Sequence, residues 1–373
     1  MISEKYMKLA VELAKKGEGS TSPNPMVGAV IVKDERIIGQ GFHERCGEPH
    51  AERNALADCI TRGENPAGAD LYVTLTPCCH YGKTPPCTEA IIENNIARVI
   101  IGSRDPNPKV LDKSISILES AGIKVITDFM KEECDRINPV FFHYITKKTP
   151  YVIMKYAMTM DGKIATAEGY SKWITGERAR DRVHRDRNRY SAIMAGIGTV
   201  LADDPLLTCR IDGKKTKNPV RIICDTNLRT PLSSKLVTTA DSVKTILATA
   251  VTDMERHRPY LEAGCKILTV KQCPDGLLNL TELMYKLGSM EIDSLILEGG
   301  AALNWSTLSA GIVNKVQAYI APKIFGGMTA KTPVGGLGVT FPKDAYYLKK
   351  PEITVLDGDI LIEWEVESCS QES

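Results

Sequence analysis

Three potential metal ligands, one histidine and two cysteines, constrain this chain more than any other feature. They are His50, Cys78 and Cys87, and Glu52 follows the histidine by two positions. Three protein ligands leave the fourth position of a tetrahedral zinc ion to water, as in catalytic rather than structural sites. Such a water ionises near neutral pH and becomes a nucleophile. The fold must therefore bring three segments around one ion, with Glu52 carrying protons rather than binding metal.

Other interpretations of these residues explain less. Each cysteine alone could be a buried apolar side chain and the histidine a surface residue, but this leaves the order of all four residues unexplained. A closed structural site would need a fourth ligand from Cys79 or His80. A sealed ion has no use for Glu52 as a proton carrier. Adjacent residues of an extended segment point in opposite directions, so we expect Cys79 to pack and His80 to contact substrate.

Length and composition indicate a globular protein with two domains. The chain has 373 residues, of which 43% are hydrophobic and 25% charged, and its net charge is +1. This balance gives no case for binding nucleic acid or a membrane surface. The first 17 residues mix both charges and predict an amphipathic helix, not a signal peptide. The 11 cysteines show no framework spacing. We therefore expect reduced thiols, no membrane span and a cytoplasmic location.

The first half of the chain alternates helical and strand patterns, which predicts an α/β domain. The expected strands are Val27–Val32, Ile37–Gly41, Leu71–Leu75, Val99–Ile101 and Val125–Ile126, with a hairpin turn at 33–36. The expected helices are 3–16, one from His50 through Ile60, one from Cys87 through Ile92, Ser114–Ala121 and Glu132–Tyr144. The polar segment 146–149 ends in Pro150, so we expect domains at 1–146 and 150–373.

A second α/β pattern fills the remainder. The expected strands are Val152–Met158, Ala192–Ala195, Val220–Cys224, Thr245–Thr249, Lys266–Val270, Ser294–Leu297, Val316–Ala321 and Ile360–Val366. The expected helices are 177–189, 253–263, 279–288 and 301–310. Gly196 and Gly198 lack the third glycine of the Rossmann fingerprint, so alone they predict only a tight turn after a strand.

The segments around the proposed ligands resemble a known family. His50–Glu52 and Pro77–Cys87 resemble the deaminase half of the bifunctional riboflavin-biosynthesis deaminase/reductase family, whose His-x-Glu and Pro-Cys order is that of zinc nucleobase deaminases. Eight residues separate the two cysteines in this family and here, whereas most cytidine-deaminase-like folds have two. The segments 23–28 and 41–43 also match. Thr76 and Cys79 stand where the family usually has Glu and Ser.

This resemblance implies a cytidine-deaminase-like three-layer α/β/α domain that binds one Zn²⁺. The implied substrate is 2,5-diamino-6-ribosylamino-4(3H)-pyrimidinone 5′-phosphate, attacked by zinc hydroxide at ring C2. Glu52 would take the water proton and pass protons to the ring nitrogen and the departing ammonia, which requires a pKa near the working pH. The implied substrate contacts in this domain are Asn24, His43, His80 and Lys83.

The second half resembles the reductase half of the same family, so the resemblance covers essentially the whole chain. The matching segments are 155–165, 171–175, 196–200, 202–210 and 298–300. They imply a dihydrofolate-reductase-like α/β domain in which NADPH passes hydride to C1′ of the ribose, giving a ribityl chain. The implied cofactor contacts are Ala157, Trp173, Thr199, Asp203, Thr226, Gly300, Ala301 and Ala302. The implied substrate contacts are Ser171, Arg187, Leu207, Arg210 and Glu298.

The chemistry of these residue types agrees with such roles. Lys155 is implied to act at the reacting ribose, and Glu298 to hold a sugar hydroxyl or the iminium formed on ring opening. An arginine fork suits the 5′-phosphate. The glycine turn at 299–300 precedes a predicted helix, whose N–H groups suit a phosphate. Alternatively, Arg187 belongs to a solvated face of helix 177–189, and Trp173 to the core.

Two other functions remain open from the sequence. One is a nucleoside or tRNA deaminase with a degenerate second domain, although the long spacing between the cysteines opposes it. The other is a zinc-stapled scaffold that senses a nucleotide. The six arginines of helix 177–189 lack the interleaved aromatic residues of a nucleic-acid site. We expect a small-molecule substrate and, by resemblance, a homodimer or homotetramer. The resemblance alone selects NADPH over NADH.

Overall fold

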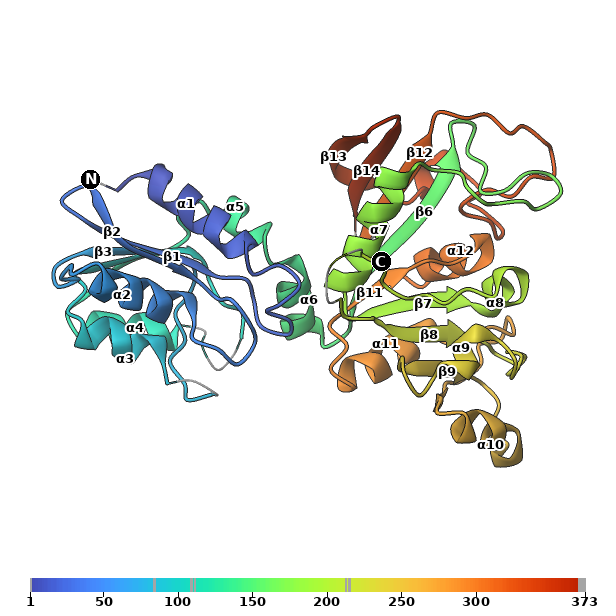
Figure 1. Ribbon diagram of the computed structural model, residues 1–373, viewed down its shortest axis with the longest axis horizontal. Coiled ribbons are helices and arrows are strands. Elements are labelled where there is room, and N and C mark those ends of the chain that lie inside the picture. The colour runs from blue at the N-terminus through green and yellow to red at the C-terminus, as the bar shows by residue number, and fades with distance from the viewer. Residues whose placement is uncertain are drawn as a thin grey trace. The chain divides into compact units, whose positions relative to one another are not determined.

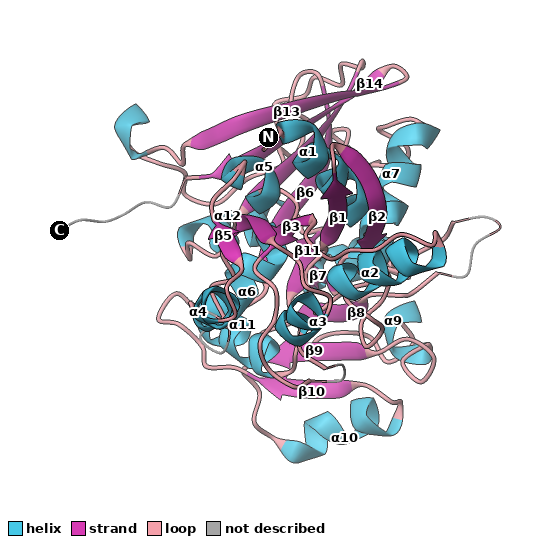
Figure 2. Cartoon of the chain, turned by 90° about the vertical axis from the view of Figure 1, so that its left-hand side faces the viewer, coloured by secondary structure: helices cyan, strands magenta, loops and turns pink. Residues whose placement is uncertain are grey.

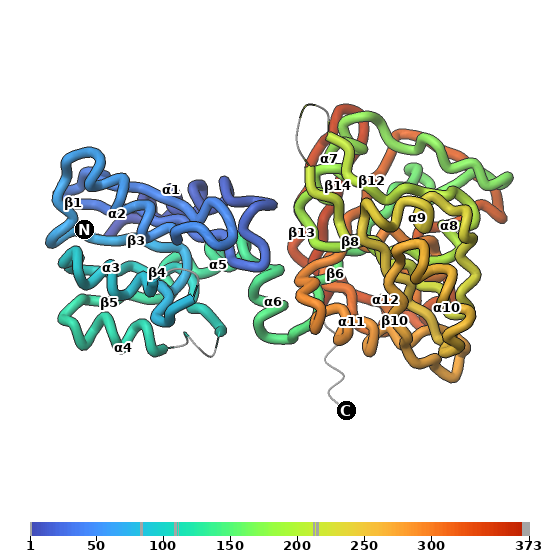
Figure 3. Tube along the Cα trace, turned by 60° about the horizontal axis from the view of Figure 1, so that its bottom comes forward, coloured from blue at the N-terminus to red at the C-terminus, as the bar shows by residue number. Residues whose placement is uncertain are grey.

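The chain folds into two compact units, Met1–Lys148 and Thr149–Ser373 (Figure 1). The computed structural model describes residues 2–82, 85–107, 110, 112–211, 213 and 216–367. The units are consecutive in sequence, so the chain passes between them once, as the colour gradient of the trace shows (Figure 3). Within the described ranges, no helix is long and apolar enough to cross a membrane.

The first unit contains a five-stranded sheet of order β2-β1-β3-β4-β5. Its strands are β1 (Gly28–Lys33), β2 (Arg36–Phe42), β3 (Asp70–Leu75), β4 (Arg98–Ser103) and β5 (Lys124–Ile126). Its helices are α1 (Glu4–Lys15), α2 (Ala51–Thr61), α3 (Cys87–Glu93), α4 (Lys113–Ser120), α5 (Lys131–Asp135) and α6 (Pro139–Lys147). The β1–β2 hairpin turns at Asp34 and Glu35, whose φ angles of 49° and 61° suit the right-handed twist of the strands.

Side chains that alternate along β1 divide the first unit into three layers. Ala29 and Ile31 join the apolar residues of α2, α3 and α4 in one core cluster. Val30 and Val32 join α1 and α5 in the other. The helices accordingly lie on both sides of the sheet in Figure 1. At Gly28, a Cβ atom would overlap the Ala10 carbonyl oxygen, so α1 can approach β1 only at a glycine. The expected three-layer α/β/α fold is confirmed.

The helix predicted over Glu132–Tyr144 is wrong, because it is two helices. α5 ends at Asp135 and α6 begins at Pro139. Proline lacks the N–H that would continue a helix and is favoured at the first helical position. The side chain of Asn138 fixes the break, because it accepts from the Met26 N–H and donates to the Met26 carbonyl, both at 2.8 Å.

The second unit contains a nine-stranded sheet of order β10-β9-β8-β7-β11-β6-β12-β14-β13. Its strands are β6 (Tyr151–Thr159), β7 (Ala192–Gly196), β8 (Val220–Cys224), β9 (Thr245–Thr249), β10 (Lys266–Thr269), β11 (Ser294–Leu297), β12 (Lys315–Ala321), β13 (Leu348–Leu356) and β14 (Asp359–Val366). Its helices are α7 (Glu177–Arg189), α8 (Ile197–Asp203), α9 (Lys235–Thr238), α10 (Met254–Glu262), α11 (Leu280–Ser289), α12 (Ala301–Ser309) and the 3₁₀ turn η1 (Pro342–Asp344).

The seven strands from β10 to β12 are parallel, and β14 and β13 add an antiparallel edge. One face of the sheet packs with residues of α11 and α12, including Leu283 and Leu308. On the other face, Ala179 of α7 packs with Tyr319 and Leu361. Figure 2 distinguishes the strands from the helices by colour. The carboxyl ends of the parallel strands meet at one edge, where α/β sheets bind ligands. The expected mixed α/β class is confirmed.

Four elements of the second unit were not expected: α8, α9, the 3₁₀ turn η1 and β13. β13 is an edge strand with eight of its nine residues exposed, so it lacks the alternation of buried residues that marks a strand. Its register also shifts between Lys349 and Glu352, on either side of Pro351. The helix α9 is too short to show a helical repeat of apolar residues in the sequence. The turn predicted at Gly196 is instead the N-cap of α8.

Candidate active sites

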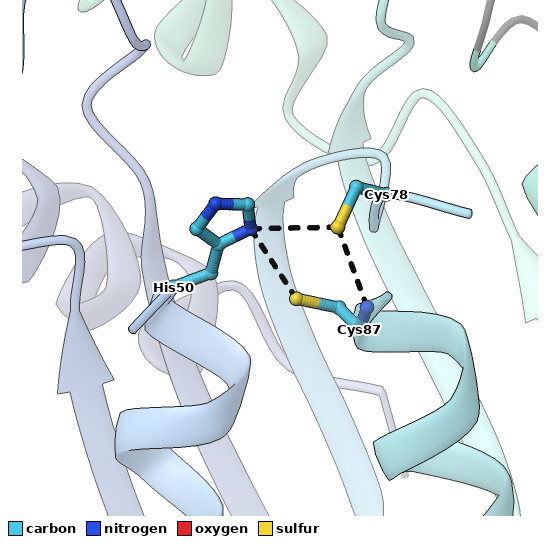
Figure 4. A group of neighbouring side chains, drawn as sticks. All are labelled: His50, Cys78 and Cys87. Carbon is cyan, nitrogen blue, oxygen red and sulfur yellow. Dashed lines mark hydrogen bonds between the residues drawn. The ribbon is translucent and has the colours of Figure 1, made fainter. Parts of the chain in front are cut away.

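The three proposed metal ligands converge in the first unit from the ends of three elements (Figure 4). His50 is the N-cap of α2, Cys78 follows β3, and Cys87 is the first residue of α3. His50 Nδ1 lies 3.4 Å from Cys78 Sγ and 3.5 Å from Cys87 Sγ. All three ligand atoms lie within 4.8 Å of one another. Residues separated by up to 37 positions therefore form one cluster.

This cluster fits a tetrahedral zinc ion. Standard Zn–N and Zn–S bond lengths put neighbouring nitrogen and sulfur ligands about 3.6 Å apart. The two nitrogen–sulfur distances of 3.4 and 3.5 Å agree with that value. In the described part of the chain, this group alone has the spacing of a metal site, and Cys79 and His80 are not part of it. Among the described residues, the potential donor set is thus one histidine and two cysteines.

The local backbone favours a thiolate at Cys78. The N–H of Cys87 donates to Cys78 Sγ at 3.3 Å, and the N–H of Thr88 donates to the Cys78 carbonyl at 3.1 Å. Hydrogen bonds from the Cys87 thiol and from His50 lower the pKa of Cys78 to about 4, although burial opposes them. The first residue of α3 therefore directs its N–H group at the sulfur, which stabilises negative charge there.

Glu52 is buried in the first turn of α2, with 3% of its surface exposed. Burial, followed by the negative charge of Cys78, raises the pKa of its carboxyl group. Its oxygens are not part of the group with metal-site spacing. Glu52 thus has the surroundings of a proton carrier beside the ligands.

Two of the predicted substrate contacts form a pair beside His50. Asn24 Nδ2 lies 3.2 Å from His43 Nε2, and His43 Nδ1 lies 3.1 Å from the Pro49 carbonyl oxygen. Since a carbonyl can only accept, the proton is on Nδ1, and Nε2 accepts from Asn24. Burial lowers the pKa of His43. Its ring meets that of His50 edge-on, with centroids 5.2 Å apart.

The remaining residues of this region have different surroundings. His80 is exposed, and Lys83 lies outside the described residues. Thr76, one of the departures from the family pattern, is buried, and its hydroxyl accepts from the Asp105 N–H at 3.1 Å. Sequence reasoning missed Arg53, which donates to the carbonyls of Pro85 and Pro86 at 3.2 and 2.8 Å. No motif marked Arg53, because its partners are backbone atoms.

The second unit contains a cavity of about 920 Å³ at the carboxyl ends of β6, β7, β8 and β11. Its volume is that of a site for a ligand of cofactor size. Ten of the residues predicted for the reductase line it: Lys155, Ala157, Ser171, Thr199, Asp203, Thr226, Glu298, Gly300, Ala301 and Ala302. These come from five separate segments of the chain. The cavity thus brings together Lys155, predicted to be catalytic, most of the predicted cofactor contacts and two of the predicted substrate contacts.

The cavity fits the diphosphate of a nicotinamide dinucleotide. α12 begins at the wall of the cavity with Gly300 as N-cap, and among the described residues no side chain caps that end. α8 begins at Gly196 in the same way. Uncapped N–H groups at a helix N-terminus are donors for phosphate oxygens. Both helices therefore suit NADPH.

Glu298 is held by two cations inside the second unit. Arg187 binds both of its carboxylate oxygens, with Nε–Oε1 and Nη2–Oε2 distances of 2.7 and 2.9 Å, and Lys155 Nζ lies 3.4 Å from Oε2. Burial alone would raise the pKa of Glu298, but the charges of Arg187 and then Lys155 lower it well below its usual range. Since the fork of Arg187 is occupied by Glu298, Arg187 positions this carboxylate.

Four predicted residues are not among the described residues that line the cavity. Trp173 is 63% exposed and stacks under Arg180, whose guanidinium lies 4.8 Å from the ring centroid. Leu207 is buried, and Arg187 contacts Glu298. The backbone N–H of Arg210 donates to His184 Nδ1, and its side chain is exposed. The cavity wall therefore includes only part of the predicted substrate set.

Fold and sites together define a two-domain protein with a cytidine-deaminase-type metal centre and a nucleotide-binding reductase domain. The chain matches the cytidine and deoxycytidylate deaminase zinc-binding region over residues 1–103 and the RibD C-terminal domain over residues 150–362. It therefore belongs to the RibD family. It carries a deaminase and a reductase domain, with Zn²⁺ and NADPH as their cofactors, as the sequence predicted.

Similar proteins cover nearly the whole chain. The riboflavin biosynthesis protein RibD of Actinobacillus pleuropneumoniae is 51% identical over 361 residues, covering 97% of this chain and 94% of that protein. The RibD of Aquifex aeolicus is 42% identical, with 97% and 98% covered. A Thermotoga maritima structure, a diaminohydroxyphosphoribosylaminopyrimidine deaminase/5-amino-6-(5-phosphoribosylamino)uracil reductase, has a TM-score of 0.84 and 39% identity, with 98% of both chains covered.

Proposed function

We propose that this chain catalyses two consecutive steps of riboflavin biosynthesis, both named in the description of its Thermotoga maritima relative. The first is hydrolytic deamination of 2,5-diamino-6-ribosylamino-4(3H)-pyrimidinone 5′-phosphate. The second is NADPH-dependent reduction of the ribosyl group to ribityl. The observation that carries the proposal is the convergence of His50, Cys78 and Cys87 beside the buried carboxyl group of Glu52.

In the first unit, His50, Cys78 and Cys87 would hold the metal. When bound, zinc lowers the pKa of water to about 7 and so makes a nucleophile available. Glu52 would take a proton from the attacking water and return protons to the ring nitrogen and the departing ammonia. Asn24 and His43 would hold the pyrimidine, since their fixed hydrogen bond leaves one Asn24 N–H and its carbonyl for the ring. His80 and Lys83 complete the proposed substrate contacts.

In the second unit, the cavity would hold cofactor and sugar together. When bound, NADPH supplies the hydride. Ring opening turns C1′ into an iminium carbon, and hydride at C1′ gives the ribityl amine. Glu298, fixed as an anion, would stabilise the iminium charge, and Lys155 beside it would hold the sugar oxygens. Arg187 would position Glu298.

The positions of the other predicted residues of the second unit support different roles for them. Ala157, Thr199, Asp203, Thr226 and the turn 300–302 would contact cofactor, which their place in the cavity wall supports. Ser171, also in the wall, would contact substrate. Arg210, with its exposed side chain, would bind the 5′-phosphate, and Leu207 would support it. Trp173 would contact the cofactor only at the outer margin of the site.

We also propose domain boundaries, a cellular location and an oligomeric state. We assign residues 1–146 to the deaminase and 150–373 to the reductase, and we place the enzyme in the cytoplasm as a homodimer or homotetramer. Exposed apolar side chains on the edge strand β13, with Ile353 67% and Val355 65% exposed, support self-association. Light scattering of the purified chain tests the oligomeric state.

A coupled assay with metal analysis tests the whole function. Purified protein should contain about one zinc per chain, release ammonia from the diamino pyrimidine phosphate, and then oxidise NADPH. Chelation should abolish ammonia release but leave reduction of the separately supplied deaminated product. Zinc without either activity would favour a nucleotide-sensing scaffold, and deamination without NADPH oxidation would favour a deaminase with a degenerate second domain.

A further inference from the structure

A cation without a partner lines the reductase cavity after strand β8. This residue, Arg229, is exposed and forms part of the cavity wall. Two other charged wall residues, Lys155 and Glu298, are paired with each other at 3.4 Å. Within the described part of the chain, the guanidinium of Arg229 has no ion pair or hydrogen bond. It is therefore available to a ligand in the cavity.

The backbone of this loop is fixed, although the Arg229 side chain is free. The fully buried Asp225 accepts through Oδ2 from the N–H groups of Arg229 and Thr230, at 2.6 and 2.7 Å. Arg256 donates to the Asn227 carbonyl at 2.7 Å. A fixed backbone limits the entropy lost when the side chain binds a ligand. Arg229 is thus presented to the cavity by a preformed loop.

Arg229 lies at the opposite end of the cavity from the proposed reacting groups. In the sheet order β8-β7-β11-β6, the loop of Arg229 follows β8, while Lys155 is in β6 and Glu298 follows β11. The step from β8 to β6 is three strand spacings, about 14 Å. The N-terminus of α12, like Glu298, follows β11, which lies between the strand of Lys155 and the strand before Arg229. A dinucleotide with its diphosphate at α12 and its nicotinamide on the Lys155 side directs its adenosine ribose toward β8.

We propose that Arg229 binds the 2′-phosphate of NADPH and so sets the preference of the reductase for NADPH over NADH. This inference rests on the proposed reductase function. The planar fork of arginine forms two charge-assisted hydrogen bonds with a phosphate, whereas NADH presents only a hydroxyl group there. In the described ranges, the other wall cation without an ion pair is Lys331, which is on the β6 side, because its carbonyl accepts from the Ile164 N–H at 2.9 Å.

Isothermal titration of the full chain with NADP⁺ and NAD⁺ tests the inference without turnover. Arg229→Met should weaken NADP⁺ binding by about 10- to 100-fold, since hydrogen bonds to charged groups have that strength, and leave NAD⁺ binding unchanged. Arg229→Lys should restore part of the preference. Lys331→Met is the matched control, because it removes the other free cation of the same cavity and should keep the preference.

Three results would overturn the inference and leave the reductase function in place. They are an unchanged preference in Arg229→Met, equal weakening of both nucleotides, and a lost preference in Lys331→Met alone. A wild-type chain that binds neither nucleotide would instead refute the proposed reductase function itself. Thermal melting of each variant identifies any that fails to fold, and Arg229→Gln replaces Arg229→Met in that case.

Discussion

Each unit places a glutamate with little solvent exposure at the centre of its proposed site, but the electrostatic surroundings of the two are opposite. Glu52 lies beside a thiolate, and burial raises its pKa. Glu298 forms ion pairs with Arg187 and Lys155, whose charges lower its pKa. A carboxyl group with a raised pKa can exchange protons, whereas one with a lowered pKa remains an anion. The same residue type is thus suited to proton transfer in one unit and to stabilising positive charge in the other.

The largest expected effect on activity comes from replacing Glu52, the proposed proton carrier. Glu52→Gln keeps the size of the side chain but cannot carry a proton, so deamination should fall by about 10²- to 10⁴-fold. Zinc content and NADPH-dependent reduction of the deaminated product should stay at the wild-type level. Ammonia release, metal analysis and NADPH oxidation measure the three quantities.

The matched variant in the other unit is Glu298→Gln, which should impair reduction and spare deamination. Near-normal ammonia release by Glu52→Gln would remove this carboxylate from the mechanism. The comparison between the two glutamates would then fail, whatever the result for Glu298→Gln.

The next largest effect is expected on the stability of the second unit, because the Arg187–Glu298 ion pair is largely shielded from solvent. Arg187 and Glu298 side chains are each 12% exposed. Arg187→Met leaves Glu298 with Lys155 alone, and breaking such a buried pair should lower the free energy of unfolding of the second unit by about 3 to 5 kcal/mol. The tryptophans Trp173, Trp305 and Trp364 all belong to this unit. Their fluorescence during urea denaturation therefore reports its unfolding.

Arg178→Met provides the control on the same helix. Its ion pair with Asp357 is 62% and 72% exposed, so its loss should change stability by about 0 to 1 kcal/mol. Equal losses in Arg178→Met and Arg187→Met would show that the helix, and not the buried pair, is responsible.

The same pair predicts a pH dependence. The pKa of Glu298 is lowered from 4.5 by folding, so its stabilising contribution is complete above pH 4.5 and is lost as pH falls toward the folded value. The second unit should therefore lose stability below pH 4.5, and the difference between wild type and Arg187→Met should narrow there. Urea denaturation at stepped pH measures this. A difference that widens on acidification would mean that Glu298 is not stabilised as an anion.

The contrast between the two sites also explains what the sequence could predict. The metal ligands occur in short motifs at fixed spacing, and an ion needs only a few atoms, so His50, Cys78 and Cys87 were recognisable before the structure. The reductase cavity is built from separate segments and backbone groups. Arg229 carries no motif, and only the sheet order places it opposite Glu298.

The fold shows a similar division. Strands with a run of buried apolar residues, such as β1, were predicted to within a residue or two. β13 was missed, because its side chains are exposed on both faces and hydrophobic alternation cannot mark it. The break at Pro139 was missed, because its fixing contact, between Asn138 and Met26, is 112 positions apart in sequence.

A smaller effect is expected where backbone contacts support the metal ligands. Arg53 holds the carbonyls of Pro85 and Pro86, directly before Cys87. Arg53→Met should weaken zinc affinity by about 10-fold, the lower range for residues that orient ligands. Competition with a chromogenic chelator measures it. Arg62→Met, at the C-cap of the same helix and paired with Asp58, is the control, and equal zinc loss in both variants would argue against a role of the loop.

The smallest effect should come from Arg210, and it separates two arginines with different surroundings. The fork of Arg187 is occupied by Glu298, whereas in the described residues the side chain of Arg210 has no such partner. If Arg210 binds the 5′-phosphate, Arg210→Ala should raise the reductase KM by about 10-fold through loss of one charge-assisted contact, with unchanged stability. Arg185→Ala, an exposed arginine of α7, should leave KM unchanged. Equal damage to deamination in Arg210→Ala would indicate misfolding, because the two activities belong to separate units.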